Sequence, residues 1–410
     1  MTPRIVSIGT AVPPTCVDQA SARELFAGQP DVDRLTRRLI HAAFDAAAIE
    51  RRHTVLSQLG GPGDTPAGAV RHDGEIRFAE ADGRMLRPTT GERNDLYIAA
   101  APELYERAAR AALTDAALDA SAITHVVTVS CTGFFAPGPD YRLVRDLGLS
   151  PRVERYHLGF IGCAAAMPGL RLAARITAAQ PDAVVLVVCV ELCTLHIRPS
   201  ADPQQIVAAS VFADGGAAAI VTADPSVGRP GGLGLDRFAT TLTSEGERDM
   251  VWTIGDHGFE MILSAEVPRI VGREIRGAVD AFLGADEAPD TWVVHPGGRS
   301  VLDRVEAGLD LDPTALDASR GVLRDFGNMS SATVLFILRR LLHDEAVADG
   351  ARIGGLAFGP GLTVESALLT KLGQPASEGA ERSEVAGREE LAPPLDAERT
   401  DEVVSGVAVA

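Results

Sequence analysis

The amino-acid sequence predicts an α/β protein built from two packed halves, and three observations support this prediction. Patterns typical of strands and of helices alternate on both sides of a stretch rich in Pro and Gly at residues 224–234. The chain has 410 residues, more than one hydrophobic core normally serves. Its hydrophobic content of 46% is ample for globular cores.

The elements of each half follow from hydrophobic periodicity. In the first half we expect helices at residues 102–117 and 168–179 and strands at residues 123–130 and 183–190. In the second half we expect helices at residues 267–283 and 301–308 and strands at residues 291–294 and 354–358. Residues 57–91, rich in Gly, Pro and charge, predict an exposed excursion. The halves are therefore assigned to residues 1–230 and 231–372.

The C-terminal segment, residues 373–410, differs in composition from the rest of the chain. It holds nine acidic residues against three arginines and no aromatic residue. Such a segment buries too little apolar surface to offset the entropy lost on ordering. We expect an acidic, disordered tail.

Composition also excludes several classes of function. The formal net charge of −18 disfavours nucleic acid and anionic membranes as partners. The five cysteines form no Cys-x-x-Cys pair, which indicates reduced thiols in a cytoplasm and argues against a metal site. No run of eighteen apolar residues and no signal segment is present, so we expect a soluble protein without membrane insertion.

Cys163 is the first candidate for chemistry. It lies in a turn of small residues, 159–169, that leads directly into a helical pattern. Unpaired backbone N–H groups at a helix N-terminus favour a thiolate and lower the pKa of a cysteine. The alternative is a buried structural cysteine, the commoner situation for this residue type.

His295 and Asn328 are the second and third candidates. His295 ends a predicted buried strand, and a Pro-Gly-Gly turn follows it. Asn328 lies just before a predicted helix at residues 332–342, where an N-cap is the ordinary alternative. A cysteine, a histidine and an amide, each placed at the end of an element, together fit a nucleophile, its charge partner and a hydrogen-bond donor.

With these three residues, the chain resembles a known family, the type III polyketide synthases of the chalcone and stilbene synthase type, within the thiolase superfamily. Four separated motifs in the right order carry the resemblance, which runs from Met1 to about Lys371: Gly162-Cys163, Val294–Gly298, Phe326–Ala332 and Phe358–Glu365. The resemblance implies the thiolase-like fold, with five layers in the order αβαβα built from two similar halves. It also implies that Cys163 meets His295 and Asn328 between these halves.

The resemblance implies a mechanism as well. Cys163 would take an acyl group from a coenzyme A thioester, with His295 keeping the sulfur ionised. His295 and Asn328 would then stabilise the enolate that forms when malonyl-CoA, or a substituted malonyl-CoA, loses CO2. The enolate would attack the acyl-Cys163 thioester, and repeated condensations would extend the chain. No cofactor beyond the CoA thioester substrates is implied, and the enzyme would be a homodimer.

Several further residues match the substrate pocket and gate of the family. Phe212 matches one gatekeeper phenylalanine, and Met261 replaces the second with a flexible thioether. The other pocket positions, which differ from those of plant chalcone synthases, are Cys131, Ala136, Cys193, His196 and Trp252. Ala136 lies in the loop that would reach across the dimer. Arg51 and Arg52 match a basic cluster that binds the CoA phosphates, although they also fit a solvated helix end.

The sequence leaves several alternatives for the starter acyl group and for the product. Small residues at Ala136 and Ala164–Ala166 favour a tunnel for a fatty acyl starter and an alkylpyrone or alkylresorcinol product. Cys131 and Cys193 instead resemble the cysteines of tetrahydroxynaphthalene synthases, which use malonyl-CoA alone, and Trp252 would shrink the cavity. A ketoacyl synthase of fatty-acid initiation and a non-catalytic scaffold are the remaining alternatives.

Overall fold

The computed structural model describes residues 2–74, 76–285 and 288–373. Within these residues, most strands belong to one nine-stranded sheet. In the order of the sheet, the strands are β11 (Thr291–Val294), β12 (Arg352–Gly359), β13 (Thr363–Leu372), β8 (Gly232–Leu242), β1 (Arg4–Ala11), β7 (Asp214–Thr222), β6 (Val184–Leu192), β4 (His125–Ser130) and β5 (Glu154–Gly159). Two small antiparallel sheets pair β2 (Thr15–Asp18) with β3 (Arg51–Thr54) and β9 (Met250–Gly255) with β10 (Gly258–Leu263).

Helices cover both parts of the large sheet and fill the space between them. The α-helices are α1 (Gln19–Ala27), α2 (Arg34–Ala46), α3 (Thr90–Ala116), α4 (Pro139–Asp146), α5 (Ala166–Ala179), α6 (Pro203–Val211), α7 (Val267–Leu283), α8 (Arg299–Leu309), α9 (Asp317–Phe326) and α10 (Ala332–His343). Short 3₁₀ turns are η1 (Ser57–Leu59), η2 (Ala120–Ala122), η3 (Gly162–Ala164) and η4 (Cys193–His196).

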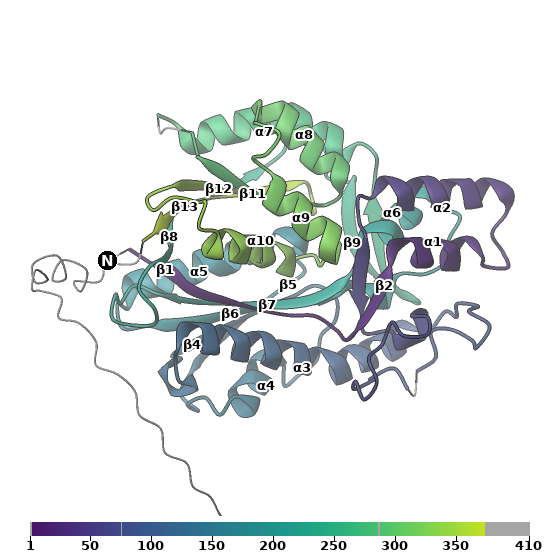
Figure 1. The fold of residues 1–410 in the computed structure, drawn as a ribbon, viewed down its shortest axis with the longest axis horizontal. Helices are drawn as coiled ribbons and strands as arrows, with labels where there is room; N and C mark the ends of the chain where they lie inside the picture. The colour runs from purple at the N-terminus through teal and green to yellow at the C-terminus, as the bar shows by residue number, and fades with distance from the viewer. Residues whose placement is uncertain (1, 75, 286–287, 374–410) are drawn as a thin grey trace, which may run out of the picture. The chain divides into compact units, whose positions relative to one another are not determined.

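The layers follow the αβαβα order, which confirms the predicted fold (Figure 1). Helices α7 and α8 cover the β11, β12 and β13 side, and α3 with α4 covers the β1, β7, β6 and β4 side. Helices α5 and α10 lie between the two sides, and α5 contacts strands of both. The two sides meet where β1 pairs antiparallel with β8, at Arg4 opposite Gly234 and Ile5 opposite Leu233. The strands therefore continue from one side to the other rather than forming separate sheets.

Buried apolar residues fill both interfaces between the middle helices and the strands. Strands β4, β6 and β7 are buried at every position, because helices lie on both of their faces. Helix α5 contributes Met167 and Leu170 to this core, and α10 contributes Leu335 and Ile337. This packing holds the ends of β11, α5 and α10 at one place, where the candidate site lies.

Two expectations about the first half need correction. The helix expected at residues 102–117 begins twelve residues earlier, because Pro102 lies inside α3 and a capping box of Thr89 and Glu92 starts the helix. Residues 57–89 are mostly irregular, but they are not an exposed excursion throughout. Asp73 is fully buried and accepts a hydrogen bond from Ser57 Oγ at 2.8 Å, and Phe78 packs into the core beneath α3.

Among the described residues, no helix is both long and apolar enough to cross a membrane. The expected tail lies almost wholly outside the described residues, since residues 374–410 are not among them.

Candidate active site

Cys163 lies in the 3₁₀ turn η3, between the end of β5 and the start of α5. Two left-handed residues shape this turn, Phe160 with φ of 56° and Gly162 with φ of 77°. A Cβ atom at Gly162 would lie 2.4 Å from Pro360 Cδ, so only glycine fits there. The tight turn brings the thiol to the N-terminal end of α5, as the sequence predicted, with the residue 8% exposed.

His295 follows β11 directly. Its backbone N–H donates to Leu356 O at 2.8 Å, which extends the pairing with β12 by one residue. The imidazole is 1% exposed, and neither ring nitrogen has a partner among the described residues. Burial lowers the pKa of His295 to about 3. The ring is therefore neutral, and both nitrogens are available to a ligand.

Asn328 lies between α9 and α10, after Gly327 at a φ of 73°. Its backbone forms an isolated parallel bridge with Phe212, in which Asn328 N donates to Val211 O at 2.8 Å and Ala213 N donates to Asn328 O at 2.9 Å. The side-chain Oδ1 accepts from Ser330 N at 2.9 Å. The Nδ2 group has a long bond of 3.4 Å to Gly297 O, and the Asn328 side chain also hydrogen-bonds with the Cys163 thiol. Both are weak contacts that a ligand can replace.

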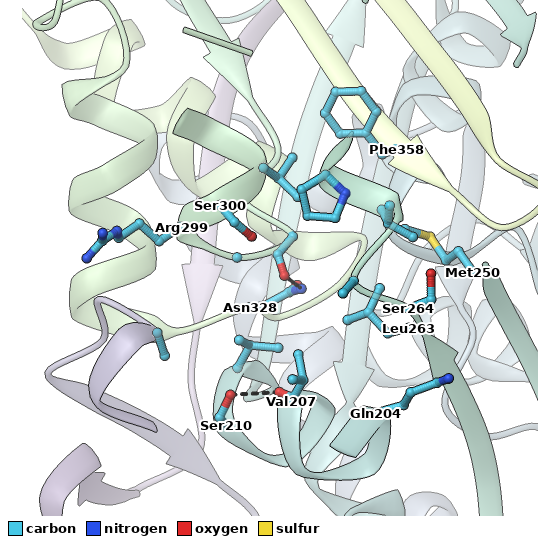
Figure 2. Close-up of a pocket in the computed structure, with 18 of the residues that line it drawn as sticks. Gln204, Val207, Ser210, Met250, Leu263, Ser264, Arg299, Ser300, Asn328 and Phe358 are labelled. Atoms are coloured by element: carbon cyan, nitrogen blue, oxygen red, sulfur yellow. Dashed lines mark hydrogen bonds between the residues drawn. The ribbon is translucent and has the colours of Figure 1, made fainter. Parts of the chain in front are cut away.

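These three residues line one pocket, a cavity of about 510 Å³. Figure 2 shows Asn328 and Ser300 reaching in from one side and Met250 and Ser264 from the other. The predicted association of Cys163, His295 and Asn328 is thus a feature of the fold. They come from three separate parts of the chain.

The expectation of a low pKa for the Cys163 thiol is wrong. Burial raises the pKa of Cys163 to about 11, although hydrogen bonding with the Ser330 and Asn328 side chains acts in the opposite direction. The nearby Glu191 carboxylate adds to the rise. Burial thus favours the neutral form of both Cys163 and His295.

Glu191 is a functional candidate that the sequence reasoning missed. It is fully buried at the end of β6, beneath the cysteine turn. Its carboxylate accepts from Ser331 Oγ at 2.5 Å, Cys131 N at 2.9 Å and Thr132 Oγ1 at 2.9 Å. Burial outweighs these bonds and raises the pKa of Glu191 to about 7. No local sequence pattern indicates Glu191 as a functional residue, because it lies within a run of residues that predicts an apolar strand.

A second, much smaller cavity adjoins the pocket at Cys163, and we call it the inner chamber. Its volume is about 20 Å³. Its lining combines three cysteines with bulky side chains: Cys131, Thr132, Gly162, Cys163, Cys193, Phe212, Met250, Trp252, Met261, Ser330 and Pro360. Phe212, Met250 and Met261 line both cavities, so they lie at the junction. Cys131, Cys193 and Trp252 line the chamber as predicted, and Met250 was missed.

Trp252 forms one wall of the inner chamber and is held rigidly. Its indole N–H donates to Cys131 O at 2.7 Å. Its ring meets the rings of His196 and Phe259 edge to face, with centroids 5.5 and 5.7 Å away. His196 stacks on Phe259 at 4.1 Å, so it supports the wall from behind.

Several predicted pocket residues lie elsewhere. His196 lines neither cavity, because its ring bonds to Thr132 O and accepts from Phe259 N behind Trp252. Ala136 is exposed on its loop and lines neither cavity of its own chain. Ala164–Ala166 are fully buried in the core between the layers, so they open no tunnel at the pocket.

The expectation that Arg52 binds CoA at the pocket mouth is also wrong. Arg52 is 5% exposed on β3, and its Nη1 donates to Ala209 O at 2.6 Å and Phe212 O at 2.9 Å. Burial lowers its pKa to about 10, opposed by the charge of Asp214. Arg51, its neighbour, is exposed but is not part of the pocket lining.

Other arginines line the pocket instead. Arg269 on α7 and Arg299 and Arg304 on α8 belong to its lining, and all three are exposed. Arg299 donates to Asp303 at 3.4 Å, and Arg269 pairs with Glu266. The sequence offered one signal for Arg299, which immediately follows the Pro-Gly-Gly turn after His295.

Comparison with known protein families gives two adjacent matches. The model for the N-terminal domain of chalcone and stilbene synthases matches residues 2–225, and the model for their C-terminal domain matches residues 235–373. Together they cover nearly the whole described chain.

Individual relatives agree with the family models. The chain is 30% identical over 374 residues to "Probable polyketide synthase 1" of Dictyostelium discoideum, a match that covers 89% of this chain and 11% of that protein. The chain thus spans about a tenth of the length of this relative.

Two solved structures are similar over almost their full length. The C-terminal type III polyketide synthase domain of "Steely1", a type I/III hybrid from Dictyostelium, matches with a TM-score of 0.81 at 30% identity, covering 91% of this chain and 100% of that domain. PKS-I from the brown alga Ectocarpus siliculosus matches with a TM-score of 0.83 at 30% identity, covering 90% and 98%.

Proposed function

Since the chain belongs to the chalcone and stilbene synthase family of type III polyketide synthases, enzymes of Claisen-type condensation, we propose that Cys163 carries the growing acyl chain and that His295 and Asn328 activate malonyl-CoA. The observation that carries this proposal is the meeting of all three side chains in one pocket of about 510 Å³. Its volume lies in the range of about 300–1,000 Å³ that is typical of small-molecule pockets, so we expect it to admit the pantetheine arm of a CoA thioester.

The first step is acylation of the thiol. Because burial favours the neutral forms of both groups, we assign His295 the role of general base rather than permanent counter-ion. It takes the proton from Cys163 Sγ as the sulfur attacks the thioester carbonyl. The carbon–sulfur bond to CoA then breaks, and the departing CoA thiolate takes that proton. An acyl group on Cys163 and free CoA result.

The second step is decarboxylation and condensation. Malonyl-CoA binds with its thioester oxygen at Asn328 Nδ2 and a ring N–H of His295, which have no other strong partner in the described chain. Loss of CO2 leaves an enolate, and each such donor is worth about 3 kcal/mol in comparable oxyanion sites. The enolate carbon attacks the acyl carbonyl on Cys163. The bond between the acyl carbon and Cys163 Sγ breaks, Cys163 leaves as a thiolate that takes a proton from solvent, and the product, longer by two carbons, remains on the CoA.

The CoA phosphates require cationic groups at the outer end of the pocket. We propose that Arg269, Arg299 and Arg304 supply them, in place of Arg52, because all three line the pocket. Arg51 is exposed on β3, and its contribution to CoA binding stays a prediction.

The inner chamber bears on the choice of starter. Its volume of about 20 Å³ is close to that of a single probe sphere the size of water. Trp252 closes it, and the alanines expected to open a fatty acyl tunnel are packed in the core. We therefore propose a short acyl or malonyl-derived starter and few extensions, in preference to the fatty acyl starter and alkylpyrone product that the sequence favoured.

A homodimer fits the exposed edge of the large sheet. Within the described chain, β5 pairs only with β4, and five of its six residues are exposed. Unpaired strand edges favour pairing with another chain. We propose that two copies join at β5, and sedimentation giving a monomer at micromolar concentration would contradict this.

The five free cysteines are consistent with a reducing compartment, so we propose a cytoplasmic location.

The test of the proposed function is mass spectrometry of the products formed from malonyl-CoA and acyl-CoA starters of graded length. We expect CO2 release and short polyketides from acetyl- to butyryl-CoA, with yields falling sharply for longer chains. No condensation with any starter would overturn the proposal. Efficient use of dodecanoyl-CoA would restore the fatty acyl alternative.

A further inference from the structure

Arg52 is a buried cation whose hydrogen bonds lead to the candidate site, while its guanidinium also lies over the Phe44 ring, 5.4 Å from the ring centroid. Its Nη1 donates to two backbone carbonyls, that of Ala209 at 2.6 Å and that of Phe212 at 2.9 Å. Ala209 lies in the last turn of α6, where carbonyl groups lack partners within the helix and attract positive charge. The guanidinium therefore closes the end of α6 and fixes the path of the chain into Phe212.

The segment that Arg52 holds is bonded directly to Asn328. Phe212 and Asn328 form the isolated parallel bridge, with hydrogen bonds of 2.8 and 2.9 Å on either side. A shift of the Phe212 backbone would therefore move the backbone of Asn328, and with it the amide donor. Phe212 itself lies at the junction between the pocket and the inner chamber.

A second contact reaches Asn328 from the other side. The stem of Arg52 packs against Gly327, where a Cβ atom would lie only 3.0 Å from Arg52 Cγ. Gly327 has a φ of 73°, so both the space and the backbone require glycine at this position. The residue immediately before Asn328 thus rests on the arginine stem.

Asp214 supplies the opposite charge to this arrangement. The charges of Arg52 and Asp214 interact, while Asp214 accepts from Val55 N at 2.8 Å and from Thr194 N at 2.8 Å. Thr194 follows Cys193 of the inner chamber. The Asp214 carboxylate thus links the end of the strand that carries Arg52 to the 3₁₀ turn η4. The Arg52 guanidinium donates its hydrogen bonds to the two backbone carbonyls.

From these contacts we infer that Arg52 is a positioning residue, which sets the location of the Asn328 amide and the Phe212 gate through the Phe212–Asn328 bridge. The inference rests on the proposed function, in which Asn328 stabilises the enolate. It predicts that loss of Arg52 impairs decarboxylation far more than acylation, because Cys163 lies on a separate turn, η3, and keeps its larger side-chain hydrogen bond, that with Ser330, when Asn328 moves.

The test measures two rates separately for each variant. One is acylation of Cys163 by butyryl-CoA, followed by peptide mass spectrometry, and the other is CO2 release from malonyl-CoA. Arg52→Met keeps most of the stem against Gly327 but removes both hydrogen bonds. Because a displacement of about 1 Å can cost about 100-fold in rate, we expect CO2 release to fall about 100-fold and acylation to change less than about 3-fold. Arg52→Lys, which retains the charge, should recover part of the loss.

Arg4 provides a matched control. It is also a buried arginine, and within the described residues its guanidinium donates to backbone carbonyls, among them Gly231 O at 2.7 Å and Val227 O at 2.9 Å. It lies on β1 and lines neither cavity. Arg4→Met should lower the thermal midpoint while leaving the ratio of the two rates unchanged.

A double-mutant cycle separates positioning from general damage. If Arg52 acts through Asn328, Asn328→Ala should slow CO2 release by a much smaller factor in Arg52→Met than in the wild type. The inference would be overturned if Arg52→Met lost acylation and CO2 release equally, as a partly unfolded protein would. It would also be overturned if the effects of Arg52→Met and Asn328→Ala on CO2 release were fully additive. If Arg52→Met does not fold, Arg52→Lys decides. A lowered thermal midpoint in Arg52→Lys, together with an unchanged ratio of CO2 release to acylation, would overturn the inference as well. Absence of CO2 release in the wild type would instead refute the proposed function.

Discussion

Replacement of Trp252 by alanine tests how the inner chamber limits the starter. The indole forms a wall of a cavity of only about 20 Å³, so its removal should open space directly beyond Cys163. Each methylene that becomes buried is worth about 0.8 kcal/mol. Octanoyl-CoA has four more methylenes than butyryl-CoA, so full burial of these gives about 3 kcal/mol, or about 100-fold in relative kcat/KM.

The assay compares kcat/KM for butyryl-CoA and octanoyl-CoA in the wild type and in Trp252→Ala. We expect the ratio to shift toward octanoyl-CoA by about 10- to 100-fold. Trp252→Ala should also lower the free energy of unfolding, because it removes a hydrogen bond to Cys131 O and aromatic contacts with Phe259.

Trp292 is the matched control, since it is the other of the two tryptophans, is buried on β11 and lines neither cavity. Trp292→Ala should cost stability without changing the starter ratio. An unchanged ratio in folded Trp252→Ala would refute the reasoning, because the indole would then not limit the chain. Equal shifts in both variants would point to a general loosening of the protein.

Three further predictions follow from the site. Asn328→Ala should leave acylation of Cys163 nearly intact and slow CO2 release from malonyl-CoA by about 100- to 1,000-fold; loss of both steps would contradict the division of roles. Arg299→Ala combined with Arg269→Ala should raise KM for both CoA substrates, by an amount that shrinks at high salt, with little change in kcat; unchanged KM values would remove these arginines from CoA binding. Burial lowers the pKa of His196 from 6.5 to about 3, so its stabilising contribution is present above pH 6.5 and is lost as pH falls toward 3. The thermal midpoint of His196→Phe relative to the wild type should therefore rise as pH falls below 6.5, and a difference independent of pH would count against this.

The wild-type pH profile alone would not isolate His196. Glu191 and Asp214 are buried carboxyls, and burial raises their pKa values to about 7 and about 6. The stability that such raised groups contribute is present below their unfolded pKa values and is lost as pH rises through the folded ones. These contributions oppose that of His196, so the difference between variant and wild type is the quantity to measure.

The bounds of secondary-structure elements were predicted best where hydrophobic residues follow a regular helical or strand period. The helix at 267–283 and the strand at 291–294 were predicted at the bounds that the structure has. The start of α3 was missed because Pro102 reads as a helix start, whereas neighbouring contacts hold it within a longer helix. The continuous sheet was not predictable, since the pairing of β1 with β8 joins residues more than two hundred positions apart.

The candidate site shows the same contrast. Cys163, His295 and Asn328 were found because turns rich in glycine mark the ends of their elements, and the pocket does unite them. Arg52 was misread, because a pair of arginines after a helical pattern looks solvated, and only the tertiary fold brings α6 over it. Likewise, Ala164–Ala166 look like the lining of a tunnel in sequence but face the core in the structure.

The central claim is that Cys163 is the nucleophile that carries the acyl group. Its most direct test is incubation of the protein with butyryl-CoA, followed by proteolysis and mass spectrometry of the cysteine peptides. We predict a single added butyryl mass on the peptide that contains Cys163, and none on any peptide after Cys163→Ala. Acylation that persists in Cys163→Ala, or that appears on Cys131 or Cys193 in the wild type instead, would contradict the assignment.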